Sequence, residues 1–330
     1  MRRPLPFILV LILLVIIAGA AFAVYRSLNV DAPLSGISVS RQIADRRPIA
    51  VMIDNFAPDA RPQSGLAQAD LVFETLTEGG ITRFMAVFQS QDASMIGPVR
   101  STRYYYNSWA AALGVIFGHD GGNVDALHEL PSLTTIYNED ADRITGPFYR
   151  ISSRAVPHNE YTSTTRLRDY AAAHQGATTG VRMSLPHKND SPSGAARSFL
   201  HIDFSYGDYN VTWEYNPAGN DYLRYMGGAP HVDAQTRKQL TAKNVVVMYT
   251  QEQPFPDPYT PGSIRLTTIG SGKATVYQDG RTIQGTWQQS SVNGPLRWLD
   301  SSGSQIPLNR GATWVEVVPN NTPVSVSASP

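Results

Sequence analysis

Two glutamates and an arginine flank a predicted tight turn. Glu74 and Glu78 precede Gly79-Gly80, and Arg83 follows it. A two-residue Gly-Gly turn joins antiparallel strands, and side chains two positions apart share one face of a strand. We therefore expect Glu74, Glu78 and Arg83 on one face, either as a solvated ion pair or as a cleft. In a cleft the arginine would set the two carboxylates to different pKa values, which makes Glu74 and Glu78 candidates for a catalytic acid and base.

Arginines form a second group of candidates. Arg100 and Arg103 follow Gly97-Pro98, and the apolar spacing of residues 99–113 predicts a helix that begins there. Two guanidiniums on its first turn repel each other and the positive end of the helix unless an anion is near. That anion is either a carboxylate of the chain, such as Asp54, or a carboxylate or phosphate of a ligand.

Histidines supply a third group. His119 stands in His119-Asp120-Gly121-Gly122, directly after a short apolar run that predicts a strand over residues 114–118. Strand ends in open α/β sheets carry ligands, so His119 is either a general base or a cap of the sheet. His158 lies in a polar loop. The spacings of Asp54, His119, His128 and His158 match no metal-ligand pattern, so we expect no metal and no cofactor.

The candidates from these motifs are, for catalysis, Glu74, Glu78 and His119, and, for binding, Asp54, Asn55, Arg83, Arg100, Arg103 and His158. Other chemistries lack their motifs. The chain has no cysteine, no G-x-S-x-G and no phosphate-binding G-x-x-x-x-G-K-[ST]. The 27 basic and 27 acidic residues balance, which leaves no electrostatic argument for nucleic acid.

Alternating strand and helix signals must position these residues in a first domain over 48–174. Residues 49–53, 71–78 and 81–88 read as strands, the last two as a hairpin, and residues 163–174 as a helix capped by Thr162 or Ser163. The segment 175–198 is turn-rich and reads as a connection. Short β-branched and aromatic runs then recur over 199–319, with a tight turn at Asp279-Gly280.

The predicted fold class is therefore α+β: an α/β-type N-terminal domain with a β-hairpin, then a mostly antiparallel β C-terminal domain. Arg224, His231 and Asp233 lie in this second domain around Gly227-Gly228, where they are either turn residues or the completion of a site. The four tryptophans of the second domain read as core, and residues 320–330 as a flexible tail.

The N-terminus adds one transmembrane helix. Residues 7–24 are uncharged and apolar, close to the roughly 20 residues that cross a bilayer. Arg2 and Arg3 place residues 1–6 in the cytoplasm, residues 25–47 read as a linker, and the folded part is expected outside a single-pass cell membrane anchor. The alternative is a signal peptide that is cleaved near Ala23, which would secrete the chain.

Several ordered motifs resemble the YerB-like family of bacterial envelope proteins. They are Asp54-Asn55, Ala60-Arg61-Pro62-Gln63-Ser64-Gly65-Leu66, Glu78-Gly79-Gly80-Ile81-Thr82-Arg83, Gly97-Pro98-Val99-Arg100-Ser101-Thr102-Arg103, His119-Asp120-Gly121-Gly122 and Pro157-His158-Asn159, followed by Arg224, Gly227-Gly228 and Asp233. The resemblance spans about residues 47–318 and implies a two-domain exported protein of a family without an established function. Members are often lipoproteins, whereas this chain has no cysteine to lipidate.

Two functions remain open at this point. One is a membrane-tethered envelope protein whose Arg/Glu/His cleft binds an anionic ligand, such as a cell-wall polymer or an envelope protein. The other is an envelope hydrolase or lyase that acts on a cell-wall polymer with Glu74 and Glu78. Both require the candidate residues to meet in one cleft.

Overall fold

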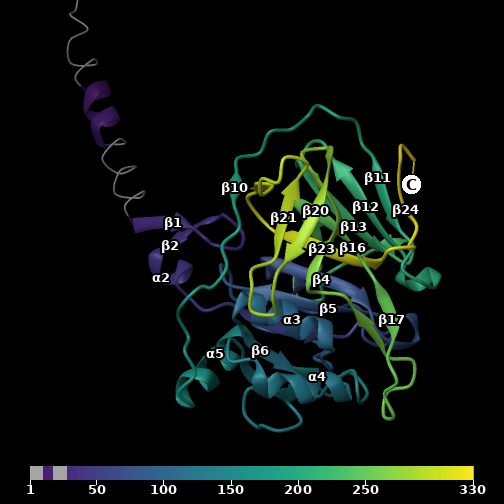
Figure 1. The fold of residues 1–330 in the computed structure, drawn as a ribbon. Helices are drawn as coiled ribbons and strands as arrows, with labels where there is room; N and C mark the ends of the chain where they lie inside the picture. The colour runs from purple at the N-terminus through teal and green to yellow at the C-terminus, as the bar shows by residue number, and fades with distance from the viewer. Residues whose placement is uncertain (1–9, 18–27, 330) are drawn as a thin grey trace, which may run out of the picture.

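One mixed sheet runs through the whole molecule (Figure 1). The computed structural model describes residues 10–17 and 28–329. Along the sheet the strands are β21 (Arg297–Asp300), β20 (Arg281–Gln289), β19 (Gly270–Gln278), β16 (Asn244–Thr250), β23 (Thr313–Pro319), β4 (Leu71–Leu76), β5 (Thr82–Phe88), β3 (Ile49–Ile53), β6 (Ile116–His119) and β7 (Tyr137–Asp140). Five of these strands come from each predicted domain. The two sequence domains therefore share a sheet, joined where β23 pairs in parallel with β4.

Both faces of the central strands β16, β23, β4, β5, β3 and β6 are buried, which explains their apolar runs. The strands β20 and β21 keep exposed residues. Along β3 the side chains of Ile49, Val51 and Ile53 enter one hydrophobic cluster, and those of Ala50 and Met52 enter another. The alternation follows from the two-residue period of a strand. The strand predicted over 49–53 is thereby confirmed.

A second sheet covers one face. Its strands are β14 (Ala229–Pro230), β13 (Asp221–Met226), β12 (Val211–Asn216), β11 (Phe199–Ile202) and β24 (Val324–Ser327), with β15 (Thr241–Ala242) paired to β13. Trp213 of β12 packs edge-on against Trp314 of β23, with ring centroids 5.3 Å apart. The mostly β character predicted for the C-terminal part is confirmed, and Trp213, Trp287, Trp298 and Trp314 are all buried in the core.

The helices α3 (Tyr104–Leu113) and α5 (Thr164–Ala173) lie against the large sheet, and α4 (Val124–Glu129) packs on α3. The short helix α2 (Arg41–Ala44) packs instead with residues 29–40. Single 3-10 turns occur at Leu66–Gln68, Glu78–Gly80, Leu130–Ser132 and Gly207–Tyr209. Trp109 of α3 stacks on Phe73 of β4 on the face opposite the second sheet. Ser163 caps α5 through the Arg166 amide, as the sequence predicts.

The helix predicted from residue 99 is wrong over its first five residues. Residues 99–103 run extended because their amides bond to distant backbone: Arg100 N donates to Met52 O, and Thr102 N donates to Gly121 O. The helix begins only at Tyr104. Arg100 and Arg103 therefore do not share a helical stripe.

The predicted hairpin forms with a different register. Thr77 N donates to Ile81 O, so Glu78 joins the two glycines in a three-residue turn. Thr75 then pairs with Arg83, and Glu74 pairs with Phe84. A shift of one residue moves side chains to the other face of a strand. The expectation that Glu74 and Arg83 share a face is therefore wrong.

Two segments that read as flexible are ordered. Within the predicted linker, β1 (Asn29–Asp31) pairs with β2 (Ser38–Ser40), and Ala32, Val39 and Ala44 form a small core. In the predicted tail, β24 pairs with β11. The linker packs largely on itself, whereas the tail strand is ordered by a partner that is distant in sequence. The remaining short pairs are β8 (Tyr149–Arg150) with β9 (Glu160–Tyr161), β10 (His187–Lys188) with β22 (Leu308–Asn309), and β17 (Glu252–Pro254) with β18 (Ile264–Leu266).

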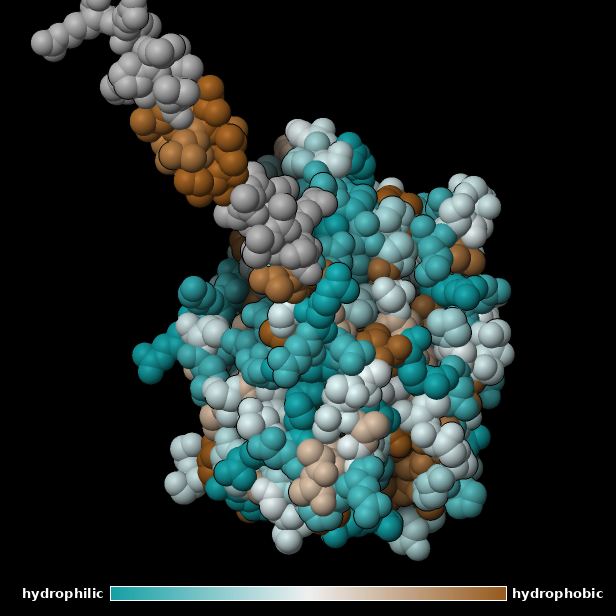
Figure 2. Space-filling model, turned by 90° about the vertical axis from the view of Figure 1, so that its left-hand side faces the viewer, coloured by the Kyte–Doolittle hydropathy of each residue, from teal (hydrophilic) through white to brown (hydrophobic). Residues whose placement is uncertain are grey.

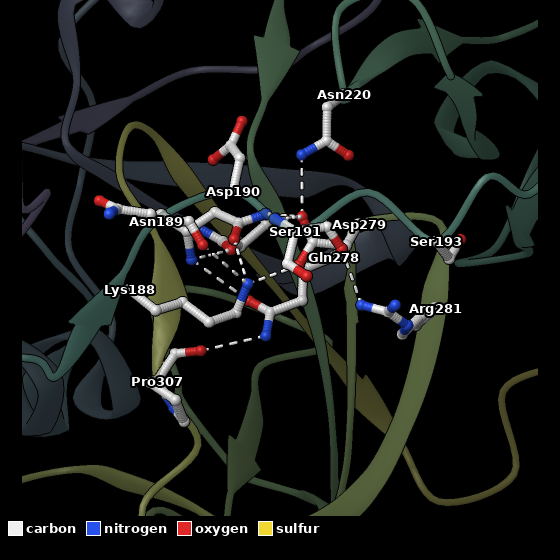
Figure 3. Close-up of polar contacts among 12 residues, drawn as sticks. Lys188, Asn189, Asp190, Ser191, Ser193, Asn220, Gln278, Asp279, Arg281 and Pro307 are labelled. Carbon is white, nitrogen blue, oxygen red and sulfur yellow. Dashed lines mark hydrogen bonds and ion pairs between the residues drawn. The ribbon is translucent and has the colours of Figure 1, made fainter.

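One buried carboxylate, that of Asp279, binds the connecting segment 175–198 to the C-terminal half of the chain (Figure 3). Asp279, in the tight β19–β20 turn, accepts hydrogen bonds from Lys188 Nζ and from Ser191 N at 3.1 Å. Asn220 and Asn309 each donate to its Oδ1 at 2.8 Å. Although burial opposes ionisation, these donors lower the pKa of Asp279 to about 2. The segment is thus fixed to the C-terminal half.

The predicted membrane segment 7–24 lies largely outside the described residues. Its described part, residues 10–17, is helical, and the side chains from Val10 to Ile17 are at least half exposed (Figure 2). Among the residues with described positions, none of the helices is both long and apolar enough to span a membrane.

Candidate functional site: an arginine cluster

Asp54 is the centre of the candidate site. Its Oδ2 lies 3.2 Å from Arg100 Nε and 2.7 Å from His158 Nδ1, and its Oδ1 accepts the Phe56 amide at 3.0 Å. Phe56 also stacks on the His158 ring, which fixes the loop that carries the histidine. Asp54 is buried, whereas the Arg100 side chain is 25% exposed. The ion pair therefore reaches from the sheet end to solvent.

Arg103 and Glu78 form a second pair beside it. Arg103 Nε donates to Glu78 Oε2 at 2.8 Å, and its Nη2 donates to Oε1, which is the two-bond geometry that suits a guanidinium and a carboxylate. A further hydrogen bond orients the Arg103 guanidinium, because its Nη1 donates to the backbone oxygen of Thr102 at 2.6 Å. The three-residue turn, which places Glu78 at the end of the central strands β4 and β5, makes this pair possible.

Arg83 lies between the two pairs. Its Nη1 donates to Ser101 O at 3.0 Å, but its buried Nε–H has no hydrogen-bond partner. Unpaired buried donors are rare because each costs about 1–3 kcal/mol. We call Asp54, Glu78, Arg83, Arg100, Arg103 and His158 the arginine cluster.

The charges in the arginine cluster do not balance. Three guanidiniums face two carboxylates, one positive charge in excess before His158 is counted. Burial opposes ionisation of Asp54, but Arg83 and Arg100 lower the pKa of its carboxyl. Burial likewise opposes ionisation of Glu78, yet Arg103 and then Arg83 lower its pKa to about 2. Burial and the charge of Arg103 lower the pKa of Arg83. Both acids are therefore ionised at neutral pH, and positive charge remains in excess within the cluster.

Glu74 and Asn55 belong to a different group on the other face of the hairpin. Glu74 is fully buried and bonds to Arg224 Nη2, and Arg224 Nη1 donates to Glu316 Oε1 at 2.7 Å. Glu74 and Glu316 are direct neighbours in the β4–β23 pairing. Asn55 reaches the same group through Thr82, which donates to Glu74 Oε1 at 2.6 Å. We call Glu74, Glu316, Arg224 and His231 the buried glutamate network.

This network holds one cation for two acids, and all three side chains are fully buried. Burial raises the pKa of Glu74 to about 8, with Arg224 opposing the shift and Glu316 adding to it. His231 accepts from Arg224 Nε at 3.0 Å through Nδ1 and donates to Gln63 through Nε2 at 2.9 Å, so it is neutral. Arg224 also lies over the Trp314 ring at 4.2 Å. The network packs the two halves together.

Comparison with known proteins fits this two-part organisation. Residues 34–178 match a family model described as "Protein of unknown function (DUF3048) N-terminal domain", and residues 200–315 match the corresponding C-terminal domain. The chain belongs to the DUF3048 family. It is 32% identical over 303 residues to the "Putative lipoprotein YerB" of Bacillus subtilis (strain 168), covering 91% of this chain and 89% of that protein. A crystal structure of the YerB protein from Bacillus subtilis has a TM-score of 0.79 at 29% identity and covers 90% of this chain and 99% of that chain. The predicted resemblance is confirmed.

In this DUF3048 chain, the predicted acid–base pair is not assembled. Glu74 is enclosed by the buried glutamate network, and Glu78 is bound by Arg103 in the turn between β4 and β5. They lie in separate groups because the register differs from the expected one. Glu316 was missed by sequence reasoning, since no motif surrounds it. Arg224 and His231 were noted only as turn residues or as part of an undefined site.

His119 is also outside the arginine cluster. It is fully buried, with Nδ1 2.8 Å from Gly121 O and Nε2 2.8 Å from Asn138 Oδ1. It therefore holds the Gly121 loop, whose backbone in turn bonds Thr102. Of the nine predicted site residues, the structure brings together the six of the arginine cluster. Within the described ranges, no three His, Asp or Glu side chains gather as a metal site would require.

Proposed function

We propose that the arginine cluster binds a polyanionic ligand in the cell envelope, such as a phosphate- or carboxylate-bearing wall polymer. The observation that carries the proposal is the excess of guanidiniums over carboxylates, together with the unpartnered buried Nε–H of Arg83. A ligand phosphate or carboxylate would supply the missing acceptor and charge. Arg100, at the solvent edge, would make the first contact.

The envelope location rests on two further observations. The relative YerB is named as a lipoprotein, and this chain carries the uncharged run 7–24 but no cysteine for a lipid. We propose that residues 7–24 anchor the chain as a single membrane span, with the folded part outside. Residues 28–47, which follow, pack on the edge of the molecule opposite β17 (Figure 1). The Glu78–Gly80 turn approaches the loop after β17, because a Cβ on Gly262 would lie 3.9 Å from Gly79 N. The turn would thus lie away from the membrane.

A binding titration tests the ligand proposal. The full chain in detergent is mixed with labelled poly(glycerol phosphate), polygalacturonate and neutral dextran, and fluorescence anisotropy reports binding. We expect the charged polymers to bind, with affinity falling as salt rises. Arg100→Ala should weaken binding about tenfold or more, because one charge-assisted contact is lost. Asp54 keeps its His158 partner in this variant, so the fold should persist.

Arg143→Ala is the matched control. Arg143 is 71% exposed and also pairs with an aspartate, Asp140, at 3.3 Å, but it lies outside the arginine cluster. Its loss should leave polymer affinity within about twofold. Equal binding of dextran, or an equal loss in both variants, would refute the proposal.

A wall digestion assay separates binding from the hydrolase alternative. Purified cell wall is incubated with the full chain, and soluble fragments are measured. We expect retention on the wall without new fragments. Fragments that disappear in Glu78→Gln would instead show an enzyme. Mass spectrometry of the chain from membranes decides the anchor: an intact N-terminus supports a permanent span, and a start after Ala23 supports cleavage.

A further inference from the structure

A second cavity lies where the two halves of the chain meet, apart from the arginine cluster. It has a volume of about 560 Å³ and opens between residues 57–62 and the β13–β14 turn. Its apolar wall consists of Ala57, Pro58, Pro62, Met226, Pro230 and Val232. Small-molecule sites typically measure about 300–1,000 Å³, are mostly apolar and favour domain interfaces. The cavity meets all three criteria.

Arg61 is the cation of this cavity. Its Nε donates to Asn55 Oδ1 at 2.9 Å, its Nη1 to Asp208 O at 2.8 Å and its Nη2 to Asn55 O at 3.3 Å. A guanidinium has five N–H groups, so two remain. All its acceptors are neutral carbonyl oxygens. Across the described part of the chain, no carboxylate pairs with Arg61, unlike Arg46, Arg100, Arg103 or Arg224.

The other polar groups of the cavity leave this charge available. His231 forms part of the lining, but both its ring nitrogens are used by Arg224 and Gln63. Asp208 contributes its backbone oxygen to Arg61, and its exposed carboxylate, like the buried carboxylate of Glu74, acts on the pKa of Arg61 only at a distance, without forming an ion pair. Arg61 is held rigidly over the Tyr209 ring, 5.1 Å from its centroid. The cavity thus combines one oriented cation with an apolar wall.

We propose that this cavity binds a small organic carboxylate with an apolar body, its carboxylate on Arg61 and its apolar part against the prolines and Met226. The carboxylate would provide the charged partner that Arg61 lacks, in the geometry that a guanidinium prefers. The inference is independent of the arginine cluster.

Three acids and their neutral amides test this site: benzoate, 4-phenylbutyrate and N-acetyl-L-phenylalanine. Isothermal titration is performed on the full chain in detergent. Partitioning of a probe into micelles is the same for every variant and cancels in the comparison. At least one acid should bind about tenfold more tightly than its amide, because only the acid pairs with the guanidinium.

Two variants locate the binding. Arg61→Met should weaken it about tenfold, and Ala229→Trp should abolish it by filling the mouth of the cavity. Ala218→Trp is the control, since Ala218 is equally exposed in another turn of the second sheet. Arg100→Ala should leave acid binding unchanged, which distinguishes this site from the arginine cluster. Equal binding of the amides, retained binding in Ala229→Trp, or no acid binding tighter than about 10 mM would overturn the proposal.

Discussion

The arginine cluster and the buried glutamate network lie on opposite faces of one hairpin and have opposite charge imbalances. In the cluster, Arg83, Arg100 and Arg103 outnumber two acids, and Arg100 is 25% exposed. In the network, Glu74 and Glu316 share the single cation Arg224, and all three side chains are 0% exposed. An excess charge that reaches solvent can be neutralised by a ligand. An excess acid without water must keep a proton instead. The comparison therefore fits the proposal that the first group binds a ligand, whereas the second group holds the two halves of the chain together.

Removal of Arg224 should have the largest effect. Arg224→Met leaves two buried carboxylates without a cation, which costs roughly 3–5 kcal/mol of unfolding free energy. Urea denaturation of the full chain measures it. Arg197→Met, which breaks the pair with Glu214 on a side chain that is 65% exposed, should cost about 1 kcal/mol or less. Similar losses in both variants would show that the network does not hold the halves together.

The pH dependence of stability should follow the two groups in opposite directions. Burial raises the pKa of Glu74 from 4.5 to about 8, so the folded state keeps a proton that the unfolded chain releases. The stability that protonated Glu74 contributes is therefore fully present below pH 4.5 and is lost as pH rises to about 8. Arg103 lowers the pKa of Glu78 from 4.5 to about 2. The ionised carboxylate therefore stabilises the folded state above pH 4.5, and this stabilisation is lost as pH falls toward 2.

Glu74→Gln checks the first of these slopes. The amide stays neutral, so the fall in stability between about pH 5 and 8 should be shallower than in the wild type. Urea midpoints across that range provide the measurement. An unchanged slope would mean that Glu74 holds no proton in the folded state.

Removal of an acid should have the smallest effect on stability and still distinguish the groups. Glu78→Gln should cost less than Arg224→Met, about 2–3 kcal/mol, because Glu78 is 23% exposed while its partner Arg103 is only 5% exposed. It raises the positive charge of the arginine cluster by one, so polyanion affinity should increase about two- to fivefold at low salt. Glu316→Gln should leave that affinity unchanged. If both substitutions change affinity alike, the two groups are not functionally separate.

Much of the sheet could be predicted from the sequence. The strand over 49–53 has the predicted bounds because a strand buried on both faces is a continuous apolar run. The Asp279-Gly280 turn also forms as expected, with Gln278 paired to Arg281. In these places the local pattern and the tertiary packing demand the same structure.

The site could be predicted only in part, because its details depend on one-residue choices and distant contacts. Gly79 and Gly80 permit either a two- or a three-residue turn, and the latter takes Glu78 out of the strand and turns Arg83 to the other face. Residues 99–103 have helical spacing but bond to β3 and to Gly121. Glu316 lies 92 positions from Arg224, and only the fold shows that they meet.

The most direct test follows the arginine Nε–H groups by nuclear magnetic resonance. Chain labelled with ¹⁵N-arginine is titrated with poly(glycerol phosphate). The Nε–H groups of Arg83 and Arg100 form no hydrogen bond in the structure, whereas that of Arg224 donates to His231. We predict saturable shifts of the Arg83 and Arg100 signals and a stationary Arg224 signal. Signals of Arg83 and Arg100 that stay in place, or an Arg224 signal that shifts as far as theirs, would contradict the assignment of the arginine cluster as the binding site.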